Sequence, residues 1–201
     1  MPSDPTHSPT PLRRIGNRIV KLEALQPGGS HKARAARFML RCAIAQGALA
    51  PDQALILVKG AGTGASFQGI ATRLREHFAN VRCELVMPPD CDLAGTCHRD
   101  HPLEGFAVGV GPPFLDSGLI DAVRIVDGAA AREGQRDMAR DIGFFPGMSS
   151  GANYAAARII SRANPDALVV TLAYDSGESY LPRPPTDLAG QVALSKTVAG
   201  Q

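Results

Sequence analysis

The sequence has no excess of charge of one sign and no long apolar run. Its 201 residues include 21 basic and 19 acidic side chains, which leaves a net charge of +2. Such a balance gives no electrostatic basis for binding nucleic acid or a membrane surface. No apolar run approaches the roughly 20 residues that cross a bilayer, and the proline-rich start, Met1 to Pro11, has no apolar signal core. The sequence therefore predicts a cytoplasmic protein with neither a nucleic-acid nor a membrane partner.

Cysteine is scarce, and its spacing does not suggest a disulfide framework. The four cysteines, none of them in a Cys-x-x-Cys pair, are Cys42, Cys83, Cys91 and Cys97. Four thiols in a chain of this length are typical of a protein without a disulfide scaffold. Cys91 and Cys97 fall close to His98 and His101, but this spacing matches no common zinc pattern. We interpret the stretch as a solvated polar loop and expect no metal, with a metal site as the alternative.

The rest of the composition is that of one globular α/β domain without internal repeats. Apolar runs predict short strands at 19–22, 54–58, 81–87, 122–126 and 167–173. Helical spacing predicts helices at 31–46, ending at Gly47, and at 67–78, 129–141 and 150–162. This alternation indicates a single open, mostly parallel sheet with helices on both faces. We expect residues 1–10 to be a disordered tail, 11–181 the domain and 182–201 a flexible tail.

A glycine-rich loop, Gly60 to Ser66, stands between the predicted strand 54–58 and helix 67–78. Strand, loop, helix and the next strand make a βαβ unit, which predicts parallel strands and a right-handed crossover. Backbone amides at the start of a helix can face an anion, and Thr63 and Ser66 add hydroxyl donors. The pattern also resembles a dinucleotide fingerprint, although Met87 to Asp90 is a poor match for the acidic residue expected there. A tight turn without a ligand is the third possibility.

A second candidate is Ser30-His31-Lys32. Ser30 is a good helix N-cap, which places Lys32 in the first helical turn. The helix dipole disfavours a cation there and so favours the neutral amine that Schiff-base chemistry requires. Taken alone, a solvated surface lysine would be the better interpretation.

Several blocks together resemble the cysteine synthase and cystathionine β-synthase family of fold type II pyridoxal-phosphate enzymes. The blocks, in the family's order, are Lys21–Glu23 with Gln26–Arg34, Gly60–Ser66, His101–Gly105 with Gly109 and Pro112-Pro113, Gly147–Ala152, and Asp175–Leu181. They cover most of residues 10–181. Several motifs in order are far more specific than one glycine loop, so we expect the large, cofactor-binding domain of that fold.

The resemblance implies pyridoxal 5′-phosphate as the cofactor and assigns roles to seven residues. Lys32 would hold the cofactor as a Schiff base and be the catalytic residue, and Ser149 would hydrogen-bond the pyridine nitrogen. The phosphate would be cradled by Gly62, Thr63, Gly64, Ala65 and Ser66. A neutral hydroxyl does not force the ring nitrogen to be protonated, which suits elimination and replacement at the β-carbon of an amino acid, as a lyase or transferase. The family also implies a homodimer.

The chain departs from the family in one large way and several small ones. The family places a smaller domain between the lysine helix and the phosphate loop, whereas only Ala33 to Lys59 lies between them here. A domain's worth of chain is missing, and with it the Ser-Gly-Asn-type loop that binds the substrate carboxylate. Alanine stands at positions 33, 65 and 107, where the family usually has aspartate, glycine and glycine, and Ser179 replaces a usual arginine.

Three hypotheses follow for the function. The first, which we favour because Lys32 and Ser149 are kept, is a pyridoxal-phosphate enzyme of altered scope. Its substrate would be a small or carrier-tethered amino acid, and a partner or second subunit could complete the pocket. The second is a non-catalytic protein that docks a protein partner in the open cleft. The third is a cavity turned to chemistry without the cofactor, in which His31 could take part.

Overall fold

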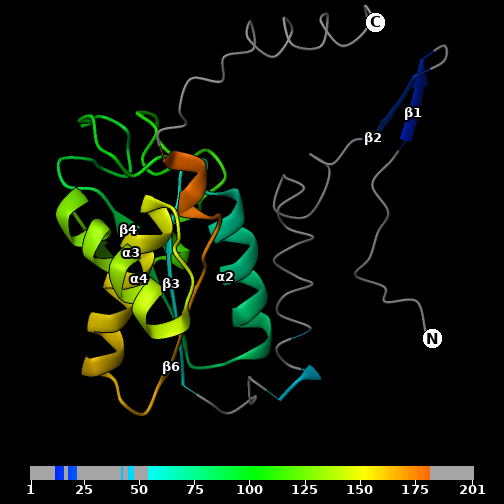
Figure 1. Cartoon of the computed structure of the whole chain (residues 1–201). Helices are drawn as coiled ribbons and strands as arrows, with labels where there is room; N and C mark the ends of the chain where they lie inside the picture. Colours follow the sequence, from blue (N-terminus) through cyan, green and yellow to red (C-terminus); the bar gives the residue numbers. More distant parts are fainter. Residues whose placement is uncertain (1–11, 16–17, 22–41, 43–44, 48–53, 182–201) are drawn as a thin grey trace, which may run out of the picture.

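The structure is a computed structural model, and it describes residues 12–15, 18–21, 42, 45–47 and 54–181 (Figure 1). The strands are β1 (Leu12–Ile15), β2 (Arg18–Lys21), β3 (Leu55–Gly60), β4 (Val81–Met87), β5 (Ala122–Ile125) and β6 (Leu168–Thr171). The helices are α2 (Ala65–His77), α3 (Gly128–Ile142) and α4 (Met148–Ala163), with short 3₁₀ helices η2 (Ser117–Leu119) and η3 (Gly177–Tyr180).

Four strands form one parallel sheet in the order β5-β4-β3-β6. Strand β3 lies inside the sheet, with Leu55 opposite Val81 of β4 on one side and Leu168 of β6 on the other. All six of its residues are buried, as expected for a parallel strand covered on both faces. Strands β1 and β2 form a separate antiparallel pair.

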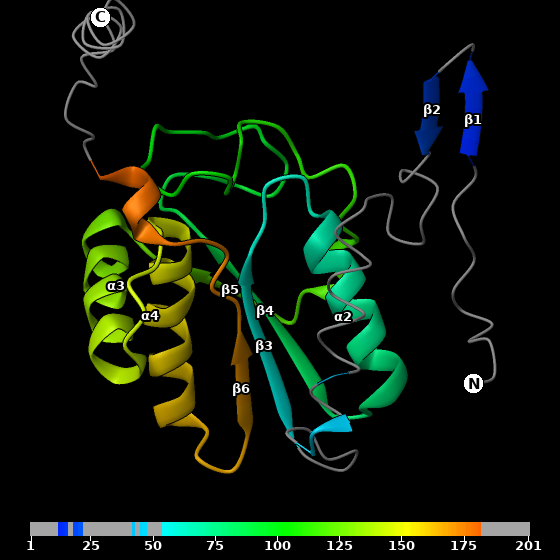
Figure 2. The same cartoon turned by 45° about the vertical axis from the view of Figure 1, so that its right-hand side comes forward.

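Helices cover both faces of the parallel sheet (Figures 1 and 2). Because side chains alternate along a strand, Leu55 and Leu57 of β3 pack with residues of α2, while Ile56 and Val58 pack with residues of α3 and α4. The unit β3-α2-β4 is the predicted βαβ unit with parallel strands. The predicted fold class, one open parallel sheet with helices on both faces, is therefore confirmed.

The described helices and strands follow the predicted ones closely. The strand predicted at 81–87 is β4, and the other predicted strands and helices in the described ranges are each found within a few residues of their bounds. Strand β1 and the two 3₁₀ helices were not predicted. Cys42 and Ala45 are helical and Gly47 has a φ of 70°, the left-handed conformation that ends a helix. The rest of the predicted helix 31–46 lies outside the described residues, as do the two predicted tails.

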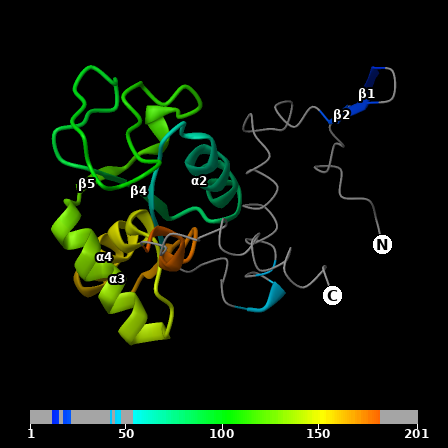
Figure 3. The same cartoon turned by 45° about the horizontal axis from the view of Figure 1, so that its top comes forward.

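The loop after β4 and the helix η3 gather at one end of the sheet, beside the start of α2 (Figure 3). This is the carboxyl end of the parallel strands, where ligands of open α/β sheets commonly bind. Within the described part of the chain, no helix is both long and apolar enough to cross a membrane.

Candidate cofactor site

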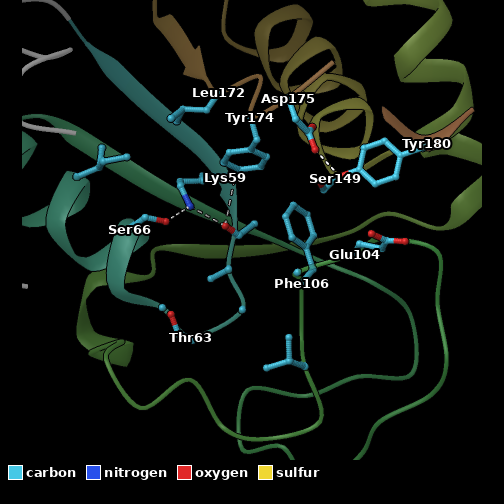
Figure 4. A pocket seen from close by; sticks show the side chains of 17 residues that line it. Lys59, Thr63, Ser66, Glu104, Phe106, Ser149, Leu172, Tyr174, Asp175 and Tyr180 are labelled. Carbon is cyan, nitrogen blue, oxygen red and sulfur yellow. Dashed lines mark hydrogen bonds between the residues drawn. The ribbon is translucent and has the colours of Figure 1, made fainter. Parts of the chain in front are cut away.

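A cavity of about 610 Å³ opens at the carboxyl end of β3. In the described part of the chain, its wall is formed by the end of β3 with the glycine loop and the first turns of α2, the loop after β4, the start of α4, and the segment from β6 to η3. The side chains labelled in Figure 4 are Lys59, Thr63, Ser66, Glu104, Phe106, Ser149, Leu172, Tyr174, Asp175 and Tyr180. Motifs more than 100 residues apart in the sequence thus meet around one space.

The glycine loop turns directly from β3 into α2. Gly64 has a φ of 85°, and no side chain of a described residue caps the helix at this position. A Cβ atom on Gly60 would lie 1.9 Å from the Phe106 ring, so glycine is needed where the loop passes under that ring. The loop after β4 is tied to the glycine loop by backbone hydrogen bonds from Ala107 to Ala61 (3.0 Å) and from Phe114 to Thr63 (3.1 Å). The start of α2 therefore keeps its first amides available beside the cavity.

Lys59 is a buried cation at the root of this loop that the sequence analysis did not single out. Lys59 is only 2% exposed. Its Nζ donates hydrogen bonds to Ser66 Oγ (2.6 Å) and to the Gly60 carbonyl (2.9 Å). Nζ also lies 5.2 Å from the centre of the Tyr174 ring, within range of a cation–π interaction (Figure 4). The signal in the sequence is a lysine that ends an otherwise apolar strand directly before a glycine loop.

Two side chains from α4 and the segment after β6 fix the first glycine of the loop. Asn153 Oδ1 accepts a hydrogen bond from the Gly60 amide (2.8 Å), and its Nδ2 donates to the Leu172 carbonyl (3.2 Å). The Tyr174 hydroxyl donates to the Gly60 carbonyl (3.3 Å). Burial raises the pKa of Tyr174 well above its ordinary value, so the phenol stays protonated and remains a donor.

Ser149 reaches the cavity from the first turn of α4, where it is 8% exposed. The segment before α4 pairs with the segment before η3 through a bridge between Pro146 and Ser176. This pairing places Asp175 and Tyr180 beside Ser149 (Figure 4). The Tyr180 hydroxyl donates to the Asp175 carboxylate, which raises the pKa of Tyr180 to about 12. The two C-terminal motifs of the sequence are therefore one structural unit.

The predicted site residues fall into three groups. Gly62, Thr63, Gly64, Ser66 and Ser149 all line the cavity. Ala65 does not, because it is 2% exposed and packs in the core under the first turn of α2. Lys32 lies outside the described residues, so its predicted role stays a prediction.

The polar loop after β4 brings three of the four cysteine and histidine candidates together. Ligand atoms of Cys91, His98 and His101 lie within 4.8 Å of one another, whereas Cys97 Sγ instead donates to the Asp90 carbonyl (3.3 Å). The Leu103 amide donates to His101 Nδ1 (3.2 Å), which puts the proton of a neutral His101 ring on the buried Nε2. A metal on Nε2 would require that proton to move to Nδ1, against the Leu103 amide. As arranged, His101 presents a donor and not a ligand at Nε2.

The backbone at Ala107 is strained in a way that the family's usual glycine would avoid. Ala107 has a φ of 38°, a conformation that side chains with a Cβ rarely adopt. The usual glycine would take this conformation without strain. The Ala107 amide nevertheless donates the hydrogen bond to the Ala61 carbonyl, so this strained residue still joins the loop after β4 to the glycine loop.

Taken together, the cavity can hold an elongated polar ligand with an anionic end. Helix-start amides, the hydroxyls of Thr63 and Ser66 and the Lys59 ammonium surround one side, and they suit a phosphate. Ser149 on α4 offers a neutral hydroxyl on the other side. Phe106 and Tyr174, whose rings pack edge to face at 6.3 Å, lie between these groups and supply an aromatic wall.

Comparison with known proteins identifies a family and several relatives in sequence. Residues 44–175, about two thirds of the chain, match the family described as pyridoxal-phosphate dependent enzymes. Cysteine synthase B of Campylobacter jejuni is 31% identical over 127 residues, which are 63% of this chain and 42% of that protein. Cysteine synthase of Helicobacter pylori is 33% identical over 125 residues, 62% of this chain and 41% of that protein. The chain thus spans about 40% of the length of these relatives.

Solved structures share the fold. The O-acetyl serine sulfhydrylase isoform 3 from Entamoeba histolytica superposes with a TM-score of 0.65 at 21% identity, covering 75% of this chain and 44% of that one. A hydrogen sulfide-producing enzyme from Fusobacterium nucleatum gives 0.64 at 25% identity, covering 79% and 47%. The resemblance drawn from the motifs and the predicted cofactor of the family are confirmed: the chain belongs to the family of pyridoxal-phosphate dependent enzymes and is similar in sequence to cysteine synthases.

Proposed function

We propose that this chain binds pyridoxal phosphate in the cavity at the carboxyl end of β3 and acts at the β-carbon of an amino-acid substrate. One observation carries the proposal. The glycine loop at the start of α2 and Ser149 at the start of α4 line the same cavity, which supports a phosphate at the loop and a pyridine ring beside Ser149. Lys32 would supply the amine that holds the cofactor.

The phosphate end of the site supports the proposal most strongly. The first amides of α2 carry the positive end of the helix dipole, and glycines at 62 and 64 let an anion approach the backbone. Ser66 accepts a hydrogen bond from Lys59, so its own proton is available to an anion. Ala65 does not obstruct this approach, because its side chain points into the core.

At the ring end, Ser149 supplies a neutral hydroxyl to the cavity. Ser149 can hydrogen-bond a pyridine nitrogen without transferring a full charge to it. When bound, pyridoxal phosphate supplies an electron sink for carbanion chemistry, and a neutral partner keeps that sink weak enough for elimination and replacement at the β-carbon. Tyr174 and Phe106 would exclude water from one face of the ring.

Substrate scope is where this chain would differ from its relatives. The sequence between Ala33 and Lys59 has no room for the small domain and no Ser-Gly-Asn-type loop. A substrate carboxylate must then be held by other groups, which favours a carrier-tethered amino acid or a pocket completed by a second subunit. We therefore propose a homodimer with altered substrate scope.

The proposal is tested by the absorbance spectrum of purified protein titrated with pyridoxal phosphate. The expected result is a saturable visible band in the wild-type chain that disappears in Lys32→Ala. Lys196→Ala, a matched change near the end of the chain, should leave the band intact. If bands appear, small β-substituted amino acids and then tethered ones should perturb them. A wild-type chain without a band, or a band that survives Lys32→Ala, would contradict the proposal and favour a docking role or chemistry without the cofactor.

A further inference from the structure

The buried ammonium of Lys59 lines this cavity and has no role among the predicted cofactor contacts. Residues 55, 57 and 59 of β3 point to the same face of the sheet, the one covered by α2. Leu55 and Leu57 pack on α2 along its length, and Lys59 follows them to the point where α2 begins. There its Nζ meets Ser66 Oγ at 2.6 Å, directly beside the cavity.

We propose that Lys59 is the cation of the phosphate subsite, which binds a phosphate monoester together with Ser66 and the first amides of α2. The inference rests on the proposed function, since it assigns a role within the same cavity. It adds a positive charge to the amides and hydroxyls that the other described residues of this subsite offer.

Contacts with described residues hold the ammonium in place for this role. The Gly60 carbonyl accepts from Nζ at 2.9 Å, and the Tyr174 ring face lies 5.2 Å away. Ser66 Oγ is another partner, and it is also a lining residue of the cavity. Since these partners belong to the loop and to the segment after β6, they hold the ammonium at the cavity wall. A preorganised charge of this kind costs little reorganisation when an anion arrives.

The test compares ligands that differ only in the phosphate. Dissociation constants for pyridoxal phosphate and for pyridoxal are measured with the wild-type chain, Lys59→Met and the control Lys196→Met. A charge-assisted contact predicts that Lys59→Met weakens pyridoxal phosphate binding by about 10- to 100-fold. Pyridoxal, which lacks the phosphate, should lose less than about threefold. Lys196→Met should change neither affinity.

Equal losses for the two ligands, or no loss for either, would overturn the inference, because Lys59 would then act on the fold or on neither ligand. Lys59→Gln keeps a hydrogen-bond donor but not the charge, and it provides the same comparison if Lys59→Met does not fold. Reduction of the complex with borohydride followed by peptide mapping must not modify Lys59. A label on Lys59 would make it the Schiff-base amine and overturn the phosphate assignment.

Inorganic phosphate separates this inference from the proposed function. If the wild-type chain binds neither pyridoxal phosphate nor pyridoxal, the proposed function fails. In that case a rise in the melting temperature with inorganic phosphate that Lys59→Met abolishes would still support an anion site at Lys59. No rise in the wild-type chain would overturn the Lys59 site as well.

Discussion

At the scale of single residues, the pair of Asp175 and Tyr180 makes the most direct prediction. The carboxylate accepts the phenol proton in a hydrogen bond and raises the pKa of Tyr180 to about 12. Asp175→Asn removes the negative charge, so the pKa of Tyr180 should fall toward the ordinary value of about 10. Ultraviolet absorbance at about pH 11 should then show Tyr180 mostly ionised in Asp175→Asn and mostly protonated in the wild-type chain.

Tyr180→Phe serves as the control that assigns this signal, since Tyr154 and Tyr174 also titrate above their ordinary range. The pair also has a consequence for stability. Because the folded pKa of Tyr180 lies above the unfolded one, its contribution is fully present below about pH 10 and is lost as the pH rises through about 12. An unchanged Tyr180 titration in Asp175→Asn would show that the hydrogen bond is not the cause of the raised pKa.

The residues of the site were partly predictable from the sequence. Ser149 and the glycine loop could be found because each belongs to a motif with its own pattern of glycines and hydroxyls, and the fold brings them to one cavity. Lys59 could not be found in this way, since strand periodicity alone does not tell a buried lysine from an exposed one. Its role depends on contacts with Ser66 and Tyr174, which are distant from each other in the sequence.

At the scale of elements, helices α3 and α4 cross closely at a pair of glycines. A Cβ atom on Gly134 would lie 2.0 Å from the Gly151 carbonyl, and one on Gly151 would lie 2.4 Å from the Ala131 carbonyl. The gain in helix propensity from Gly134→Ala is about 1 kcal/mol, but the added methyl must push the two backbones apart. We expect Gly134→Ala to lower the free energy of unfolding by about 1–3 kcal/mol.

Chemical denaturation measures this change, with Glu133→Ala as the control. Glu133 is the exposed neighbour of Gly134 on α3, and its replacement should stay within about 0.5 kcal/mol of the wild-type value. Since α4 carries Ser149 in its first turn, the same shift of α4 should also weaken cofactor binding. A Gly134→Ala chain as stable as Glu133→Ala would contradict the close crossing.

The helices and strands were predictable because the spacing of apolar residues and the residues that start or end each element agree along most of the described chain. Strand β4 is mostly apolar and ends in the run Leu85–Met87, and α3 begins at the N-cap Asp127 and ends at Gly143 in the left-handed conformation. The two 3₁₀ helices were not predicted, since each is too short to show a period. Each starts at a side-chain cap, Asp116 or Ser176. Aspartate and serine are equally common in turns, so these residues alone do not predict a helix.

At the scale of the whole molecule, the class of the fold could be predicted but the order of its strands could not. Alternating strands and helices indicate a parallel sheet, yet β6, the last strand, lies beside β3 and not beside β5. That placement brings the segment after β6 to the glycine loop, and it is set by packing between distant parts of the chain. It creates the cavity, because Tyr174 and Asp175 reach it only from this position.

We propose that this relative of cysteine synthases binds pyridoxal phosphate in the cavity at the carboxyl end of β3. The chain spans about 40% of the length of its relatives, but the described segments of the cavity wall come from its own sequence. The glycine loop, Ser149 and Lys59 all line this cavity.

The most direct test is borohydride reduction of the chain mixed with pyridoxal phosphate, followed by digestion and mass mapping of the modified lysine. The chain offers Lys21, Lys32, Lys59 and Lys196 as candidates. The account predicts one stoichiometric modification, on Lys32, that excess inorganic phosphate reduces by competing at the glycine loop. Modification spread over several lysines, or none at all, would contradict a cofactor site in this chain.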